Sequence, residues 1–388
     1  MSQITKNRML SIDALRGIAA FLVVVFHVFA AGKVFEDRLS IGNLSGWNYL
    51  YFFPAYGYVG VYLFFVISGF CIHLRWAKTK ASDDKRKPKI DFIAFWKRRW
   101  IRLYPAYIAA MILYLWWEYH QGMLVFNGFF AWDTISHLLM IHNFDNRTAY
   151  SMNGVFWTLA IEEQLYLLYF LLLFLRERWG WTVTLTLTFA SRFLWLGVSL
   201  FVTKVIGFEL PFTEGALANW WIWALGAIAI ENYYKVIEFP RWCYSPWIGS
   251  FFFICAAAVK YLGFASPATH TFEQIAFVAE PFLWGASFFF LINFVTSREK
   301  VFAGLRSGRF SFVAAWAFVG LFSYSLYLTH ELLLPIAEGV NRYLVCILCL
   351  VFAYVFFLIF ERPFMVFLAR QKTRPNSDSI IPEITVAN

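Results

Sequence analysis

Three ionisable side chains lie in an apolar stretch near the N-terminus. Asp13, Arg16 and His27 fall within residues 11–31, a run long enough to cross a lipid bilayer. An ionisable group deep in a bilayer costs roughly 2.5–3.5 kcal/mol on insertion scales, so such groups usually face the inside of a helix bundle. The sequence therefore predicts a functional face on a helix over this stretch.

The spacing of these residues suggests a chemical role for the histidine. Arg16 and His27 are eleven positions apart, close to three helical turns, which places both on nearly one face about 16 Å apart. Asp13 lies one turn before Arg16, where a carboxylate–guanidinium pair is natural. Imidazole exchanges protons near neutral pH, so His27 is a candidate general base. The alternative is a structural Asp–Arg pair and a histidine bonded to a neighbouring helix.

The composition sets the fold class. The chain has 388 residues, of which 60% are hydrophobic and 15% charged, whereas soluble domains carry about a quarter charged residues. We predict an all-α, polytopic integral membrane protein with a single membrane domain over residues 1–370 and a disordered cytoplasmic tail over 371–388. The apolar stretches predict ten transmembrane helices, over 10–31, 50–75, 101–119, 154–175, 180–203, 215–234, 246–264, 275–296, 312–334 and 343–361.

The positive charges predict an orientation. If the N-terminus is inside, 25 of the 33 Lys and Arg residues fall in inner segments. That asymmetry is typical of N-in/C-in topology. The net charge of +9 is then mostly a topology signal, and no nucleic-acid partner is expected. The five cysteines show no metal-ligand pattern, and no metal is expected.

Two further clusters lie at the predicted second and third spans. Gly60, Ser68 and Gly69 form a thin surface that favours close helix packing. Arg99 and Arg102, with Lys97 and Arg98 beside them, lie at the inner end of the third span. Such cations commonly anchor a helix at anionic headgroups. Alternatively, Arg99 and Arg102, one turn apart, form a clamp for a phosphorylated ligand.

The remaining polar clusters lie toward the outer ends of predicted spans. Trp157 to Tyr166 contains the adjacent carboxylates Glu162 and Glu163, and Ser323 to Glu331 contains Tyr327 and His330. Each cluster taken alone fits a structural ion pair or a residue at the interface.

The five motifs together, in this order, resemble the integral-membrane acyltransferase family 3 from residue 10 to residue 363. That family has a basic residue, ten intervening residues and a histidine, as Arg16 and His27 do. Thr158 and Leu165 depart from its pattern, which has Ser and Phe there. The other matching segments are Gly60–Phe70, Arg99 to Pro105, Trp157 to Tyr166 and Ser323 to His330.

The resemblance implies an acyltransferase that moves an acyl group, usually acetyl, from cytoplasmic acyl-CoA to a hydroxyl of an envelope carbohydrate. O-antigen lipopolysaccharide and exopolysaccharide are examples. The expected setting is the bacterial inner (plasma) membrane. Membrane lipid is an expected partner, and a separate periplasmic protein is a candidate partner. Acetyl-CoA is the expected donor co-substrate.

The resemblance also implies roles for residues. His27 would deprotonate the acceptor hydroxyl, Glu162 would orient the imidazole or the acceptor, and Arg16 with Asp13 would shape the lower channel. A covalent acyl-histidine is the competing route. The rival function is a transporter or flippase of a glycan or lipid-linked sugar, with the buried ion pair as its gate. The donor-binding set is Arg98, Arg99, Arg102 and Ser68, and the acceptor-binding set is Trp157, Tyr166, Tyr327 and His330.

Overall fold

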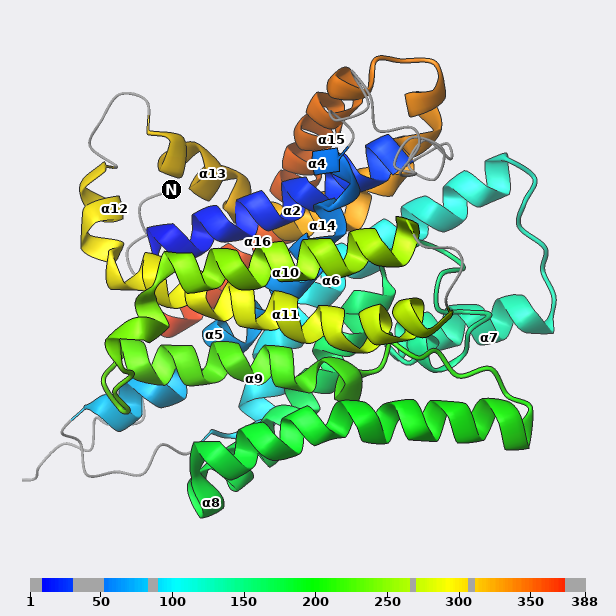
Figure 1. Ribbon diagram of the computed structural model, residues 1–388. Coiled ribbons are helices and arrows are strands. Elements are labelled where there is room, and N and C mark those ends of the chain that lie inside the picture. The colour runs from blue at the N-terminus through cyan, green and yellow to red at the C-terminus, as the bar shows by residue number, and fades with distance from the viewer. Residues whose placement is uncertain (1–8, 31–51, 83–89, 266–269, 306–310, 374–388) are drawn as a thin grey trace, which may run out of the picture.

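The computed structural model describes residues 9–30, 52–82, 90–265, 270–305 and 311–373, and all regular structure in them is helical (Figure 1). The all-α prediction is confirmed. In the predicted tail, residues 371–373 end the last helix, and 374–388 lie outside the described residues. The α-helices are α2 (Leu10–Ala30), α4 (Phe52–Ala55), α5 (Gly60–Ala81), α6 (Phe92–His120), α7 (Gly128–Leu138), α8 (Trp157–Phe201), α9 (Ala216–Tyr233), α10 (Pro246–Ala265), α11 (His270–Ser297), α12 (Glu299–Leu305), α13 (Phe312–Leu321), α14 (Ser323–Thr329), α15 (Arg342–Phe356) and α16 (Arg362–Thr373).

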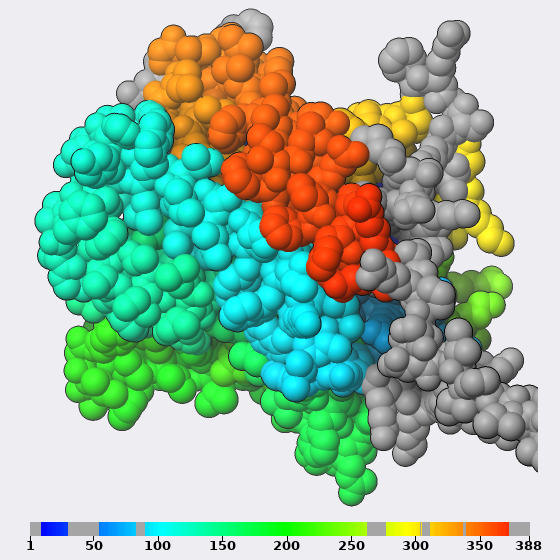
Figure 2. Space-filling model, turned by 180° about the vertical axis from the view of Figure 1, so that it is seen from behind, coloured from blue at the N-terminus to red at the C-terminus, as the bar shows by residue number. Residues whose placement is uncertain are grey.

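Shorter helical segments join several of these helices. The 3-10 segments are η2 (Gly57–Val59), η3 (His142–Phe144), η5 (Arg241–Tyr244) and η6 (His330–Glu338), and the π-helical segments are η4 (Val202–Ile206) and η7 (Phe357–Glu361). Both η7 and α16 pack along α6, and the red and cyan surfaces adjoin in Figure 2.

The chain is a helical membrane protein. Helix occupies most of each of the ten predicted stretches. Within the described residues, five helices are long and apolar enough to cross a membrane, or six if one bent pair counts as a span. The count of ten and the N-in/C-in orientation stay predictions.

Three predicted spans have shapes that hydropathy did not indicate. The stretches 154–175 and 180–203 are the two arms of α8, which is broken at Gly180, where φ is 77°. The stretch 312–334 bends by 62° between α13 and α14. This bend matters for the site, because α14 contributes Tyr324 and Tyr327 to the central cavity.

Glycines bring the central helices into backbone contact. A Cβ on Gly69 of α5 would lie 1.9 Å from the Trp223 carbonyl oxygen of α9, and one on Gly226 of α9 would lie 1.8 Å from that of Val66. Only a residue without a side chain permits such an approach. The packing role predicted for Gly69 is confirmed.

Glycines also bring α2 and α13 into backbone contact. A Cβ on Gly17 would lie 2.1 Å from the Trp316 carbonyl oxygen, and one on Gly320 would lie 1.9 Å from that of Asp13. The helix that carries Arg16 and His27 is therefore held at a fixed distance from the C-terminal part of the bundle.

A buried polar network joins α5, α8 and α9. His73 places Nε2 2.9 Å from Glu231 Oε1 and Nδ1 3.1 Å from the Tyr169 hydroxyl. Arg176 donates to both Glu231 oxygens at 2.8 and 2.7 Å, and the Trp181 indole donates at 2.9 Å. Each buried charge is thus paired within the protein, as an apolar surrounding requires.

The segment between α7 and α8 is internally braced. The rings of His137 and His142 stack at 3.9 Å, and Thr148 donates to the His142 carbonyl at 2.7 Å. Ser151 donates to the Asp133 carboxylate at 2.6 Å. Burial, together with the neighbouring His137 ring, lowers the pKa of His142 well below its ordinary value. His142 is therefore neutral at physiological pH, and these contacts hold the segment in one shape where it enters α8.

We expect Gly226→Ala to destabilise the protein by about 1–3 kcal/mol, because the added methyl group meets backbone that cannot rotate away. Thermal unfolding of the detergent-purified protein measures this. Gly197→Ala in α8 is the matched control, because a Cβ there meets nothing within 4 Å. Equal melting temperatures for the two variants would contradict the close α5–α9 packing.

We expect Glu231→Gln to destabilise the protein by about 3–5 kcal/mol, because Arg176 and His73 lose the carboxylate that pairs with them in a buried site. Glu177→Gln, at an exposed position of α8, should leave the unfolding temperature unchanged. An undiminished melting temperature for Glu231→Gln would show that the network contributes little to stability.

Candidate active site

A cavity of about 800 Å³, including its open end, lies between α2, α5, α6, α8 and α14. The cavity brings together side chains from helices far apart in the sequence. The residues singled out from sequence that line it are Arg16, Ser68, Arg99, Arg102, Glu162, Tyr166 and Tyr327.

Three guanidinium groups and one carboxylate face this cavity. Arg99 lies over the rings of Phe95 and Tyr166, at 5.7 and 5.4 Å from their centroids. The Tyr166 hydroxyl donates to Glu162 at 3.2 Å. The excess of positive charge on the cavity wall suits an anionic ligand. One guanidinium can donate two parallel hydrogen bonds to two oxygens of a phosphate group.

Tyr327 of α14 also lines the cavity. Its hydroxyl lies 2.7 Å from Thr158 Oγ1 and 3.4 Å from the Val155 carbonyl oxygen. Its ring packs edge-on against Phe64 at 5.8 Å and lies 6.0 Å from the His330 ring. Tyr327 therefore links the arginine-lined cavity to a second group of polar side chains.

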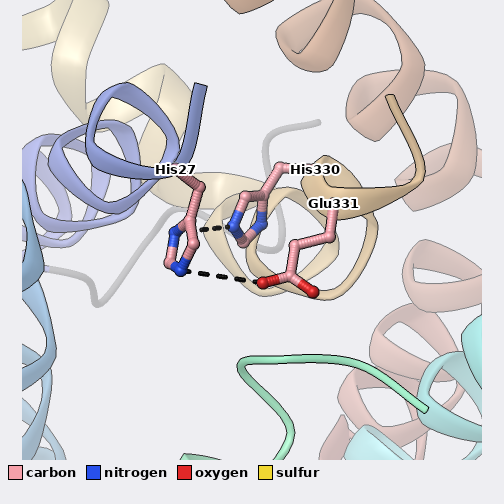
Figure 3. Close-up of side chains that lie close together, drawn as sticks. All are labelled: His27, His330 and Glu331. Atoms are coloured by element: carbon pink, nitrogen blue, oxygen red, sulfur yellow. Dashed lines mark hydrogen bonds and ion pairs between the residues drawn. The ribbon is translucent and has the colours of Figure 1, made fainter. Parts of the chain in front are cut away.

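That second group consists of His27, His330 and Glu331 (Figure 3). His330 Nε2 lies 3.3 Å from His27 Nδ1, and His27 Nε2 lies 3.6 Å from Glu331 Oε1. The three side chains come from α2 and from the start of η6, and they face one another. His330 is fully buried, whereas the side chains of His27 and Glu331 are 23% and 14% exposed. The group is accessible from one side.

The backbone determines which ring nitrogens carry hydrogen. His330 Nδ1 lies 2.9 Å from the Tyr327 carbonyl oxygen, and His27 Nδ1 lies 2.9 Å from that of Val23. A carbonyl oxygen only accepts, so we assign the hydrogen of each neutral ring to Nδ1. Each Nε2 then keeps its lone pair, and that of His27 is directed toward Glu331.

Glu331 is positioned by the chain that enters α8. The Gly154 N–H donates to Glu331 Oε2 at 2.8 Å. A Cβ on Gly154 would lie 2.8 Å from Glu331 Oε1, so a larger residue would displace the carboxylate. A carboxylate held beside an imidazole stabilises the imidazolium that forms when the ring accepts a proton. The arrangement can therefore take a proton from a hydroxyl group.

The other residues singled out from sequence lie around these two sites. Asp13 and Arg98 are not among the residues that line the cavity, and Asp13 contacts Gly320 through its backbone carbonyl. Trp157 begins α8, with its ring 6.4 Å from that of Tyr150. Glu162 lies in the cavity, and the carboxylate beside His27 is Glu331.

Sequence reasoning noted Glu331 only as the end of a motif and assigned it no role. Its signal was its position next to His330, but adjacent residues of an α-helix point about 100° apart. The structure changes from α14 to the 3-10 segment η6 at His330, and both side chains reach His27.

Comparisons with known proteins agree with this arrangement. A family model described as an acyltransferase domain matches residues 9–361. The O-acetyltransferase OatA of Staphylococcus aureus (strain NCTC 8325 / PS 47) is 26% identical over 367 residues, which cover 86% of this chain and 51% of that protein. The peptidoglycan O-acetyltransferase OatA of Listeria monocytogenes is 28% identical over 183 residues, covering 43% of this chain and 24% of that protein.

The chain spans about half the length of the Staphylococcus relative. No solved structure matches this chain. The family match extends over nearly the whole bundle, including the helices that supply the cavity and the histidine group. The chain therefore belongs to the integral-membrane acyltransferase family 3.

Proposed function

We propose that this protein is a membrane O-acetyltransferase that moves an acetyl group from cytoplasmic acetyl-CoA to a hydroxyl of an envelope carbohydrate in the bacterial inner membrane. Membership of the acyltransferase family supports the reaction class. The observation that carries the proposal is the arginine-lined cavity, which includes Tyr327 in its wall, next to the His27 group.

The cavity suits the donor. Coenzyme A carries a 3′-phosphate and a diphosphate at one end and a thiol at the other. Arg99 and Arg102 would hold the phosphates, with Arg98 beside them on α6, and Arg16 would contribute positive charge further in. The slender pantetheine arm would lie along the apolar wall, which includes Phe64, Phe65 and Ile72. The thioester would then approach Tyr327.

The histidine group suits the transfer. The acceptor hydroxyl gives its proton to His27 Nε2 while its oxygen attacks the thioester carbonyl carbon. The C–S bond breaks, the thiolate leaves and takes up a proton, and an ester and free coenzyme A result. Glu331 would stabilise the imidazolium formed on His27, at the observed 3.6 Å between Oε1 and Nε2. A covalent acyl-histidine intermediate is the alternative route.

The acceptor is proposed as a carbohydrate because the relatives are named as O-acetyltransferases, one of them acting on peptidoglycan. O-antigen lipopolysaccharide and exopolysaccharide belong to the same chemical class. Trp157 would contact the sugar, whereas Tyr166, expected from sequence to do the same, lies under Arg99 in the cavity proposed for the donor. A separate periplasmic protein would receive or deliver the acyl group.

We expect His27→Ala to slow acetyl transfer by about 10²–10⁴-fold, the usual contribution of a general base. Mass spectrometry of surface glycans from expressing cells, compared with an empty-vector strain, detects the acetyl ester and identifies its acceptor. His120→Ala, at an exposed position of α6, is the control and should retain full activity. Wild-type ester levels with His27→Ala would exclude both the base and the acyl-histidine route.

We expect Arg99→Ala and Arg102→Ala each to raise the KM for acetyl-CoA by about ten- to a hundredfold, since a hydrogen bond to a charged group is worth about 1.5–3 kcal/mol. Transfer of labelled acetyl by the purified protein measures this and distinguishes an enzyme from a flippase. Lys97→Ala, exposed on the same helix, should leave the KM unchanged. An equal effect of all three substitutions would assign the arginines to headgroup anchoring.

A further inference from the structure

We propose that His27, His330 and Glu331 form a binding site for a divalent transition-metal ion of the zinc type, with at least one coordination position open. This inference goes beyond acyl transfer. Because the two histidines are separated by 303 positions, the sequence showed no metal motif and no metal was expected.

The first argument comes from the lone pairs at the centre of the group. With the hydrogen of each neutral ring on Nδ1, His330 and His27 each have an unprotonated Nε2, and Glu331 offers the carboxylate oxygen Oε1. His330 Nε2 accepts from the His27 Nδ1–H at 3.3 Å, whereas His27 Nε2 and Glu331 Oε1, 3.6 Å apart, both only accept. Two acceptors that face each other in a partly buried place cost free energy unless a proton or a cation lies between them. A divalent metal ion satisfies all three at once.

The second argument is geometric. Two donors about 2.1 Å from a tetrahedral ion lie about 3.4 Å apart. His27 Nε2 and Glu331 Oε1 are 3.6 Å apart, and the donor atoms of the three residues all lie within 4.8 Å of one another. Two histidines and one glutamate are an established ligand set for zinc with an open position.

The third argument is the set of groups behind the ligands. Metal-binding histidines usually donate their other ring N–H to a carbonyl or carboxylate, and ligating carboxylates are themselves hydrogen-bonded. His330 Nδ1 faces the Tyr327 carbonyl and His27 Nδ1 faces the Val23 carbonyl. The Gly154 N–H donates a hydrogen bond to Glu331 Oε2, the oxygen that does not face His27. All three candidate ligands are therefore oriented by backbone.

Other histidines of the described chain lack this arrangement. Both ring nitrogens of His73 already have partners, in Glu231 and Tyr169. The rings of His137 and His142 stack almost parallel, with 5° between their planes, so their in-plane lone pairs do not converge. Within the described residues, the His27 group is the one in which three such donors meet.

A bound metal ion would use the His27 lone pair that base catalysis needs. Metal binding and proton transfer at Nε2 therefore exclude each other, and zinc would act at this site as an inhibitor. The binding measurement below needs neither donor nor acceptor, so its outcome is independent of whether the proposed acyl transfer is correct.

Titration with Co²⁺ tests the proposal, because four-coordinate Co²⁺ absorbs strongly in the visible range. The full chain, purified in detergent without a polyhistidine tag, should bind one Co²⁺ with that absorption. Zn²⁺ should displace it, since zinc binds such sites more tightly than cobalt. Glu331→Ala and His330→Ala should each weaken binding at least about tenfold.

Two variants separate loss of ligand from loss of fold. Glu331→Gln keeps an oxygen for the Gly154 N–H and removes the charge, so it should bind Co²⁺ weakly at an unchanged melting temperature. His120→Ala removes an exposed histidine and should keep full binding. The proposal is overturned if the wild type shows no saturable Co²⁺ absorption, or if Glu331→Gln and His330→Ala retain it.

Discussion

Lipid offers no hydrogen-bond partners, and this constraint governs the arrangement of the whole bundle. Each charged side chain in an apolar helix must find its partner inside the protein. The buried polar network of α5, α8 and α9 supplies such partners for Glu231, because Arg176, His73 and Trp181 bond to its two carboxylate oxygens. The wall of the central cavity carries three arginines and one glutamate. Positive charge therefore prevails on this wall, which suits an anionic ligand.

Close helix packing makes the cavity possible. Gly69 and Gly226 bring α5 and α9 into backbone contact, while Gly17 and Gly320 do the same for α2 and α13. With these pairs in contact, α2 and α5 present Arg16 and Ser68 to one space. The bend between α13 and α14 adds Tyr327 from the C-terminal side. Small residues at the contacts thus determine which large polar residues meet.

The two candidate sites differ in what they offer. The cavity combines positive charge with an apolar wall, which suits a long anionic donor. The His27 group is small, partly exposed and rich in lone pairs, which suits a proton or a metal ion. Tyr327 contacts both, because it lines the cavity, bonds with Thr158 through its hydroxyl and has its ring beside that of His330. In the proposed acyl transfer, donor and base would therefore meet near Tyr327.

The sequence by itself determined the helical class, the apolar stretches and the polar residues inside them, because these follow from composition and from periodicity within one helix. It also identified seven of the residues that line the cavity. Four of them are charges in or beside apolar helices, and the other three, Ser68, Tyr166 and Tyr327, followed from the resemblance to the acyltransferase family. It did not show that Glu331 is the carboxylate next to His27, that Gly154 holds Glu331, or that His73 pairs with Glu231. Those contacts join residues 177 and 158 positions apart in the last two cases. Only the tertiary structure decides them, because they depend on the rotation of each helix against its neighbours and on a change of helix type at His330, and neither is encoded in local spacing.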